Sequence, residues 1–306
     1  MHKKLKDGSD VMTWEWKIGD PVDDANGGSM DAMNWGHGRD DEEGDSFGGR
    51  SENPKIMEYA RKAYDLYMDN RDEEALHYIN MALDLNDRHA DNWDVKAVIL
   101  DGMKRYAEAE RCYNRSLELH PHNLVYDNKA RMLYAWAVQL LEESKKLSNG
   151  TAMLNDANAK LTKAIRALPG ENSEEDVEKY LKLRDSINFY IDYERKYQQN
   201  LERVKKYDKS ELFTITGRQF HNSGVALTPG MPLRLVREAD NEYDSDAVAV
   251  YAGDVKIGYV ANNDYTKSDL TSSASELNVS ETAEGSYLCY LDRYADIQFA
   301  VARLVK

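Results

Sequence analysis

The sequence has few of the residues that build disulfide or metal-bound scaffolds. Its 306 residues include only two cysteines, Cys112 and Cys289, which lie in regions of different sequence pattern. It contains no Cys-x-x-Cys pair, and its seven histidines do not combine with cysteine at zinc-ligand spacings. We therefore expect no disulfide scaffold and no metal site, and no motif predicts a cofactor.

Long apolar runs are also missing. No window approaches the ~18 consecutive apolar residues of a membrane span, and the mean hydropathy is −0.74. The lysines at positions 3, 4 and 6 are not followed by the apolar run of a secretory signal. These absences predict a cytoplasmic protein with no membrane partner.

Positive charge is scarce as well. The formal net charge is −15, and residues 207–306 contain nine basic against fifteen acidic residues. Phosphate backbones are usually bound by clusters of Lys and Arg that release counterions, and no such cluster is present in the sequence. Any nucleic-acid binding should therefore be local and directed at something other than the duplex backbone.

The motifs of common catalytic sites are absent. The sequence contains no G-x-x-x-x-G-K phosphate loop, no nucleophile elbow and no H-E-x-x-H zinc motif. Pairs of Asp and Glu are frequent, but in a chain this acidic they do not single out a site. We expect that the protein is not an enzyme.

Residues 1–54 are predicted to form an acidic, glycine-rich disordered tail. They hold nine of the 18 glycines and an acidic run from Asp40 to Asp45, and they show no periodicity. Trp14, Trp16 and Trp35 leave two interpretations open. They are either aromatic residues of a solvated tail or parts of a short motif that docks on this protein or on a partner.

From about residue 55 the sequence has the periodicity of amphipathic helices and contains an internal repeat. One triplet recurs 34 residues later, as Ala75, Ile79 and Ala82 and then Ala109, Tyr113 and Ser116. This spacing resembles the tetratricopeptide (TPR) repeat, a pair of antiparallel helices with small residues where the backbones approach closely. The resemblance implies a helical solenoid that binds an unidentified protein or peptide.

A third copy of the repeat is predicted at Ala157, Leu161, Ala164 and Pro169. It lies 48 residues after Ala109 instead of 34. The excess of 14 is close to four helical turns, so lengthened helices would keep their apolar face in register. We expect three TPR-like repeats over residues 55–171 and a capping or linker helix over residues 172–208.

Residues 209–306 change to the period-two pattern of β-strands. Six short segments, rich in β-branched and aromatic residues, are predicted as strands: 212–216, 233–237, 247–251, 256–260, 286–291 and 297–304. Six short strands in under a hundred residues favour a compact barrel or curled sheet. One helix is expected within residues 262–279.

Three segments of this module carry a specific pattern. Asn241-Glu242-Tyr243-Asp244 joins two predicted strands, Ile257-Gly258-Tyr259 follows it, and Thr216-Gly217-Arg218-Gln219-Phe220-His221 precedes it. This arrangement resembles the HIRAN domain, which occurs in some SNF2-type DNA translocases and as a stand-alone bacterial and archaeal unit. The resemblance implies an OB-like barrel that captures the 3′ end of single-stranded DNA. The fold class expected for the chain is therefore multidomain α+β, a TPR solenoid followed by a small OB-like β-barrel.

The resemblance also implies a nucleic-acid-binding site. Tyr243 and Asp244 match an aromatic and an acid that contact the terminal nucleotide, Asn241 is the polar position of the same loop, and Phe220 matches an aromatic that stacks on a base. Stacking would contribute about 1–3 kcal/mol per base without sequence preference. A carboxylate at Asp244 could accept a hydrogen bond from a free 3′-hydroxyl while repelling a terminal phosphate.

Phosphate contacts are expected from Arg218 or Arg237. Two positions depart from the DNA-binding members of the family. Gln219 stands where those members place an arginine before the stacking aromatic, and Asn262 replaces a basic residue after the Gly-Tyr strand. The loss of these cations should weaken DNA binding.

A purely structural interpretation of the same residues stays open. Asn241, Asp244 and Asp246 could be turn-forming residues whose side chains accept hydrogen bonds from nearby backbone N–H groups. Tyr243 could pack over the barrel end, and Phe220 could belong to the core.

Two hypotheses follow for the function. In the first, the protein is an adaptor whose barrel binds single-stranded DNA ends while the repeats bind a protein. In the second, it is a protein-interaction scaffold whose barrel has lost the DNA role. A positive rim formed by Arg218, Arg234 or Arg237 would favour the first hypothesis, and its absence would favour the second.

Overall fold

The computed structural model describes residues 53–168, 174–221, 224–291 and 299–305. The predicted tail, with Trp14, Trp16 and Trp35, therefore lies outside the described residues, as does Pro169 of the third predicted repeat. The contacts of the chain divide it into two units, a helical unit that ends at Phe189 and a second unit that begins at Tyr190.

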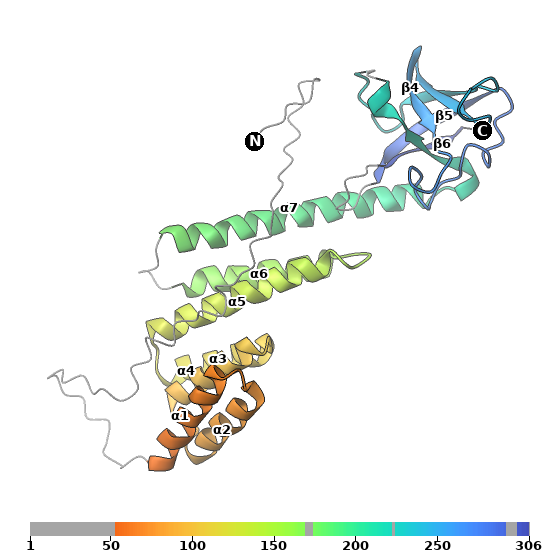
Figure 1. Ribbon diagram of the computed structural model, residues 1–306. Helices are drawn as coiled ribbons and strands as arrows, with labels where there is room; N and C mark the ends of the chain where they lie inside the picture. Colours follow the sequence, from red (N-terminus) through yellow and green to blue (C-terminus); the bar gives the residue numbers. More distant parts are fainter. Residues whose placement is uncertain (1–52, 169–173, 222–223, 292–298, 306) are drawn as a thin grey trace. The chain divides into compact units, whose positions relative to one another are not determined.

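The helical unit consists of consecutive helices that pack as hairpins, α1 with α2, α3 with α4 and α5 with α6 (Figure 1). Their bounds are α1 Pro54–Met68, α2 Asp72–Leu85, α3 Ala90–Gly102, α4 Tyr106–Leu119, α5 Asn123–Ser144, α6 Thr151–Ala167 and α7 Glu174–Val204. The helical N-terminal region predicted from the sequence is therefore confirmed. Its assignment to the TPR family stays a prediction.

The internal repeat has a structural counterpart. Helix α4 begins 34 residues after α2, and the two predicted triplets are buried on these helices. Ala157, Leu161 and Ala164 are likewise buried on α6. The longer spacing before this third set coincides with longer helices, since α5 has 22 residues and α6 has 17.

Helix α7 contributes to both units. In the helical unit the buried Tyr180 packs against Tyr134, with the ring centroids 4.8 Å apart. In the second unit Val204 belongs to an apolar cluster with Leu212 and Leu288. The side-chain amide of Asn200 also donates to the backbone carbonyl of Tyr290 at 3.0 Å. The end of α7 is thus part of the packing of the second unit.

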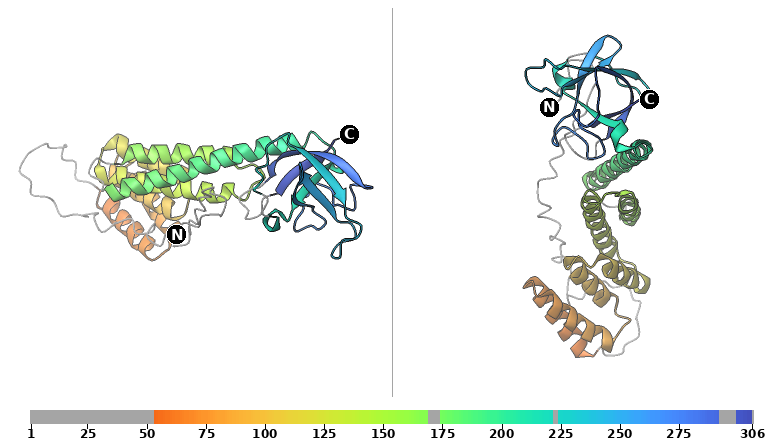
Figure 2. Two further views of the ribbon diagram at one scale, coloured as in Figure 1. Left: turned by 90° about the horizontal axis from the view of Figure 1, so that it is seen from above. Right: turned by 90° about the vertical axis from the view of Figure 1, so that its right-hand side faces the viewer.

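The second unit is a closed barrel of antiparallel strands, visible in the right-hand view of Figure 2. The strands are β1 Leu212–Thr216, β2 Pro232–Arg237, β3 Val248–Ala252, β4 Val255–Val260, β5 Thr282–Leu291 and β6 Phe299–Leu304. Around the barrel they follow the order β1-β4-β3-β2-β5-β6. The predicted change from helices to a six-stranded barrel is confirmed.

The interior of the barrel is filled by alternate side chains of the strands. Phe213, Leu235, Val250 and Ile257 are fully buried there, as expected from their period-two placement. Strand β4 approaches β1 so closely at Gly258 that an added Cβ would lie 2.3 Å from the backbone oxygen of Thr216. Because this position also has φ +156°, only glycine fits it without strain.

The helix expected within residues 262–279 is a wrong prediction. This segment consists of turns and one isolated bridge between Ser272 and Phe213 of β1. The segment is instead hydrogen-bonded to Thr214 of β1. The Thr271 hydroxyl pairs with the Thr214 hydroxyl at 2.8 Å, and the Ser268 N–H donates to the same Thr214 oxygen. Such hydroxyl bonds compete with helix formation. A 3₁₀ turn, η3 Arg218–Phe220, was not predicted.

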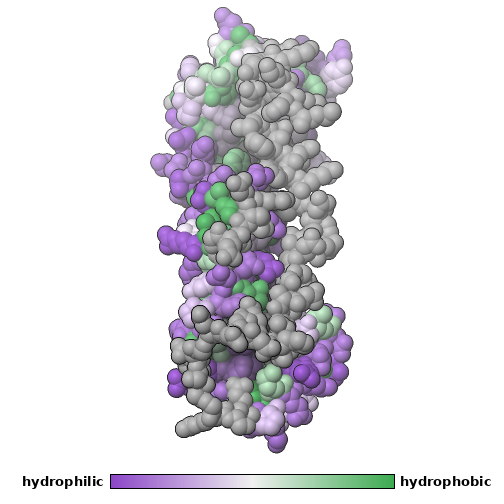
Figure 3. Space-filling model, turned by 90° about the vertical axis from the view of Figure 1, so that its left-hand side faces the viewer, coloured by the Kyte–Doolittle hydropathy of each residue, from purple (hydrophilic) through white to green (hydrophobic). Residues whose placement is uncertain are grey.

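The described residues on the face shown in Figure 3 are mostly hydrophilic. Where Figure 3 shows described residues, hydrophobic side chains occur in small separate patches among hydrophilic ones. Among the described residues, none of the helices is both long enough and apolar enough to cross a membrane.

Candidate nucleic-acid interface

The loop between β2 and β3 is built from turns closed by side chains. The Asn241 Oδ1 accepts from the backbone N–H groups of Tyr243 at 3.0 Å and Asp244 at 3.2 Å. The Asp244 Oδ1 in turn accepts from the N–H of Asp246 at 2.9 Å. Asn241 and Asp244 therefore have the turn-forming role that the structural interpretation proposed. This role fixes the backbone and leaves the Tyr243 ring outside the loop.

Both aromatic residues predicted for the site are exposed to solvent. The Tyr243 side chain is 96% exposed and that of Phe220, at the end of η3, is 80% exposed. Neither ring packs over the barrel end or belongs to the core, so the packing interpretation of both residues is wrong. An exposed ring on a defined turn can stack on a base without first leaving a buried position.

Asp244 is oriented by an uncharged group. The side-chain amide of Asn262 donates to both oxygens of the Asp244 carboxylate, at 3.0 and 3.3 Å. Asn262 is the position where the sequence resemblance implied a basic residue. Asn262 therefore provides a hydrogen-bond donor to the Asp244 carboxylate, as a basic residue could, but carries no positive charge.

A hydrogen-bonded network joins the loop to β4. Lys256 donates to Glu238 at 2.7 Å and to the Tyr259 hydroxyl at 2.6 Å, and Asn241 donates to Glu238 at 3.2 Å. Partial burial opposes ionisation of Glu238, but the hydrogen bonds from Lys256, Asn241 and Tyr259 outweigh it and lower the Glu238 pKa.

The same network reaches the second exposed aromatic. The ring of His221, next to Phe220, lies 5.6 Å from the Tyr259 ring, and η3 contacts β4. The structure therefore brings Phe220 to the same region of the barrel as Asn241, Tyr243 and Asp244, although more than twenty residues separate them in sequence.

The predicted phosphate-binding arginines both contact other groups of the barrel domain. Half-buried Arg218 donates to the Val225 carbonyl at 2.9 Å and to the Tyr290 hydroxyl, and burial lowers its pKa. Arg237 pairs with Asp246 at 2.9 Å.

Arg234, the third residue considered for a positive rim, lies over the ring of Tyr251, 4.7 Å from its centroid. Each of the three arginines thus has a partner within the barrel. Among the described residues, only Arg237 of the three is paired with an acidic group, and Arg234 stays exposed to solvent.

Sequence reasoning missed one exposed aromatic at this site. Tyr265 is 88% exposed and follows Asn263, whose Oδ1 accepts from the Tyr265 N–H at 3.1 Å. The available signal was the pattern Asn-acid-Tyr, which occurs both at Asn241-Glu242-Tyr243 and at Asn263-Asp264-Tyr265. Within the described ranges, no group of three or more His, Cys, Asp or Glu residues could hold a metal ion.

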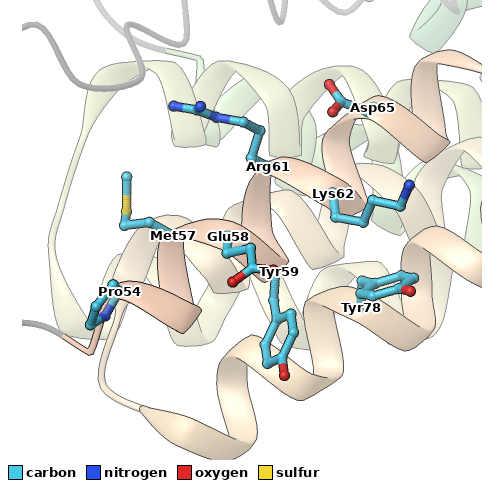
Figure 4. Close-up of a pocket in the computed structure, with 8 residues that line it drawn as sticks. All are labelled: Pro54, Met57, Glu58, Tyr59, Arg61, Lys62, Asp65 and Tyr78. Carbon is cyan, nitrogen blue, oxygen red and sulfur yellow. The ribbon is translucent and has the colours of Figure 1, made fainter.

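The helical unit offers a separate surface feature. A hollow of about 480 Å³ lies between α1 and α2 and is lined by Pro54, Met57, Glu58, Tyr59, Arg61, Lys62, Asp65 and Tyr78 (Figure 4). The rings of Tyr59 and Tyr78, one from each helix, have centroids 6.2 Å apart. The lining combines these rings with two basic and two acidic side chains, which is a surface suited to a peptide of mixed polarity.

Comparison with known proteins assigns the barrel to a family. The HIRAN domain model matches residues 210–268, a range that contains all six predicted site residues. The chain contains a HIRAN domain. This is a nucleic-acid-binding domain family, and the match spans β1 to β4 with the site loop between them.

A second comparison found a similar protein of unknown function. An uncharacterized protein of Methanocaldococcus jannaschii is 38% identical to this chain over 72 residues, which cover 84% of that protein and 23% of this chain. The HIRAN protein described here therefore spans most of this short relative, while most of its own length lies outside the match.

Proposed function

We propose that the HIRAN barrel binds the 3′ end of single-stranded DNA and that the helical unit binds a protein partner. In this proposal the chain is an adaptor without catalytic activity. The observation that carries it is the exposure of the Phe220 and Tyr243 rings on two segments of the barrel that both connect to Tyr259, through the His221 ring contact and through Glu238 and Asn241. The TPR-like repeat and the Tyr59–Tyr78 hollow support a peptide-binding role for the helices.

The chemistry of such a site follows from its groups. Terminal bases stack on Phe220 and Tyr243, which contributes about 1–3 kcal/mol per base. The Asp244 carboxylate, held by Asn262, accepts a hydrogen bond from the 3′-hydroxyl. A terminal 3′-phosphate would place a second anion against it and is therefore repelled. Such a site recognises the end of a strand and needs little positive charge.

Fluorescence anisotropy with the full chain tests this function. A 5′-labelled oligonucleotide with a free 3′-hydroxyl is titrated beside the same oligonucleotide with a 3′-phosphate. We expect the hydroxyl form to bind at least about tenfold more tightly, since one lost hydrogen bond to a charged group and one repulsion are worth about 1.4 kcal/mol or more. Equal affinities, or no binding below about millimolar, would overturn the proposal.

A second candidate is a protein-interaction scaffold in which the barrel does not bind DNA. It is favoured by one specific observation, the contacts that Arg218, Arg234 and Arg237 make with other groups of the barrel domain. This candidate predicts that neither oligonucleotide binds, whereas substitutions in the Tyr59–Tyr78 hollow still abolish capture of a protein partner. The two candidates therefore differ in the same titration.

A further inference from the structure

Two turns of this HIRAN barrel repeat one local structure. In each, an asparagine Oδ1 accepts from the backbone N–H of the tyrosine two residues later and of the residue after it. For Asn241 the distances are 3.0 and 3.2 Å, and for Asn263 they are 3.1 and 3.1 Å. Each turn holds its tyrosine ring in solvent, 96% exposed for Tyr243 and 88% for Tyr265.

The two turns are direct neighbours in space. The amide of Asn262, adjacent to the second turn, donates to the carboxylate of Asp244 at the end of the first. Both tyrosines are thus anchored within a few residues of one hydrogen-bonded pair. In the part of the barrel that the structure describes, Phe220, Tyr243 and Tyr265 are the exposed aromatic side chains.

Tyr265 has no evident role in the stability of the barrel. A ring that is 88% exposed buries little apolar surface, and burial is what an aromatic side chain contributes to a fold. Its turn is closed by Asn263 and by the pairing of Lys267 with Asp264 at 3.5 Å. Neither of these contacts uses the ring.

We propose that Tyr265 is a third stacking residue, which holds a second base of a strand whose terminal nucleotide lies at Asp244. The inference rests on the proposed binding of single-stranded DNA ends. Stacking is available to every base and needs no cation, which suits a site whose arginines are engaged elsewhere. Because the turn already fixes the backbone of Tyr265, that backbone loses little conformational freedom when the base docks.

A cycle of protein and ligand changes tests the role of Tyr265. The full chain and its Tyr265→Ala, Tyr265→Phe and Val255→Ala variants are titrated with a labelled six-nucleotide strand carrying a 3′-hydroxyl. The same strand is then used with an abasic residue at the second or at the third position from the 3′ end. Val255 is the matched control because it is an exposed apolar residue, 43% exposed, at the start of β4, whereas Tyr265 lies beyond its end.

Tyr265→Ala should weaken binding of the intact strand about tenfold, the loss of one stacked base. Tyr265→Phe and Val255→Ala should bind like the unchanged chain. An abasic residue at one of the two positions should weaken binding to the unchanged chain. It should not weaken binding to Tyr265→Ala any further, because the affinity losses from removing the two partners of one contact do not add. An unchanged midpoint of thermal unfolding shows that Tyr265→Ala is folded.

Two results would overturn the inference, and they are distinguishable. If Tyr265→Ala binds like the unchanged chain, or if its effect adds to both abasic losses, Tyr265 does not stack, while the 3′-hydroxyl preference still supports the proposed function. If the unchanged chain binds none of the strands, the proposed function fails and the role of Tyr265 fails with it.

Discussion

The carboxylate of Asp244 accepts hydrogen bonds from the Asp246 N–H and from the Asn262 amide. Neither donor is charged, so the anion is oriented without being neutralised by a cation at short range. This arrangement suits the recognition of a hydroxyl group and disfavours an additional phosphate. In the proposed function, the residues of this site therefore distinguish strand ends mainly by repelling a terminal phosphate.

Substituting Asp244→Asn should remove the preference for a 3′-hydroxyl. The asparagine oxygen still accepts the Asp246 N–H, so the turn is kept while the negative charge is lost. We expect the ratio of affinities for hydroxyl and phosphate ends to fall from about tenfold or more to about one. The measurement is the paired anisotropy titration. A ratio that stays unchanged in a folded variant would mean that another group recognises the end.

Gly258→Ala should destabilise the barrel by about 2 kcal/mol or more, since a Cβ there meets the Thr216 oxygen at 2.3 Å and the backbone is strained. Urea unfolding of the full chain, followed by near-ultraviolet circular dichroism, measures the loss. Gly230→Ala is the matched control, because its φ is +88° but its Cβ would meet nothing within 4 Å. A loss for Gly258→Ala no larger than that of the control would contradict the packing argument.

At the element scale, helix α3 carries the buried acid Asp94 and the half-buried acid Asp101. Asp94 is 3% exposed, and burial raises its pKa to about 7, against a hydrogen bond with Asn128 and together with the charge of Asp91. Burial likewise raises the pKa of Asp101 to about 7, against the attraction of Arg131. Ionisation of these groups therefore weakens the packing of α3 against its neighbours.

The stability of the helical unit should fall between about pH 4 and pH 7 on account of Asp94. In this window the folded chain holds a proton that the unfolded chain, with an ordinary pKa of 3.8, has released, so each rise in pH favours unfolding. The contribution is on the order of 3 kcal/mol, fully present below pH 4 and lost above pH 7.

Comparison with Asp94→Asn isolates this contribution, because all other titrating groups are shared. Urea unfolding is followed by far-ultraviolet circular dichroism at pH 4.5 and pH 8. The variant should gain stability relative to the unchanged chain as pH rises. A difference between the two proteins that does not change with pH would show that Asp94 is not buried in its protonated form.

The elements themselves were largely predictable from the sequence, and the reasons are local. The strand Leu212–Thr216 was predicted at its observed bounds because alternation of β-branched and aromatic residues is a short-range signal. The helix expected within 262–279 failed because the segment bonds to β1, a partner about fifty residues away. The engagement of Arg218 with Tyr290 was unpredictable for the same reason, since it depends on tertiary neighbours.

At the scale of the whole molecule, the net charge of −15 sets how a polyanion can bind. Residues 207–306 carry an excess of acids, and Lys256 and Arg237 at the site are paired with Glu238 and Asp246. In the proposed function, binding of a strand end should therefore release few counterions.

The affinity for a single strand should depend little on salt. The logarithm of affinity against the logarithm of salt concentration should have a slope smaller in magnitude than about 0.7, which is less than one neutralised phosphate. Anisotropy titrations at several salt concentrations between about 50 and 300 mM give the slope. A slope near −2 would mean about three phosphate contacts and would require Arg218 or Arg237 to leave its partner.

The end of helix α7 determines where the barrel domain can be excised or joined to another protein. The family match begins at residue 210, yet Val204, with the partly buried Tyr197 and Leu201, completes an apolar cluster with Leu288 and Val301. A gene fragment that begins at residue 210 would encode a barrel whose apolar residues Leu288 and Val301 lack the cover of helix α7. Any transplant or excision of the domain should therefore start at about Tyr190 and carry roughly four turns of helix with it.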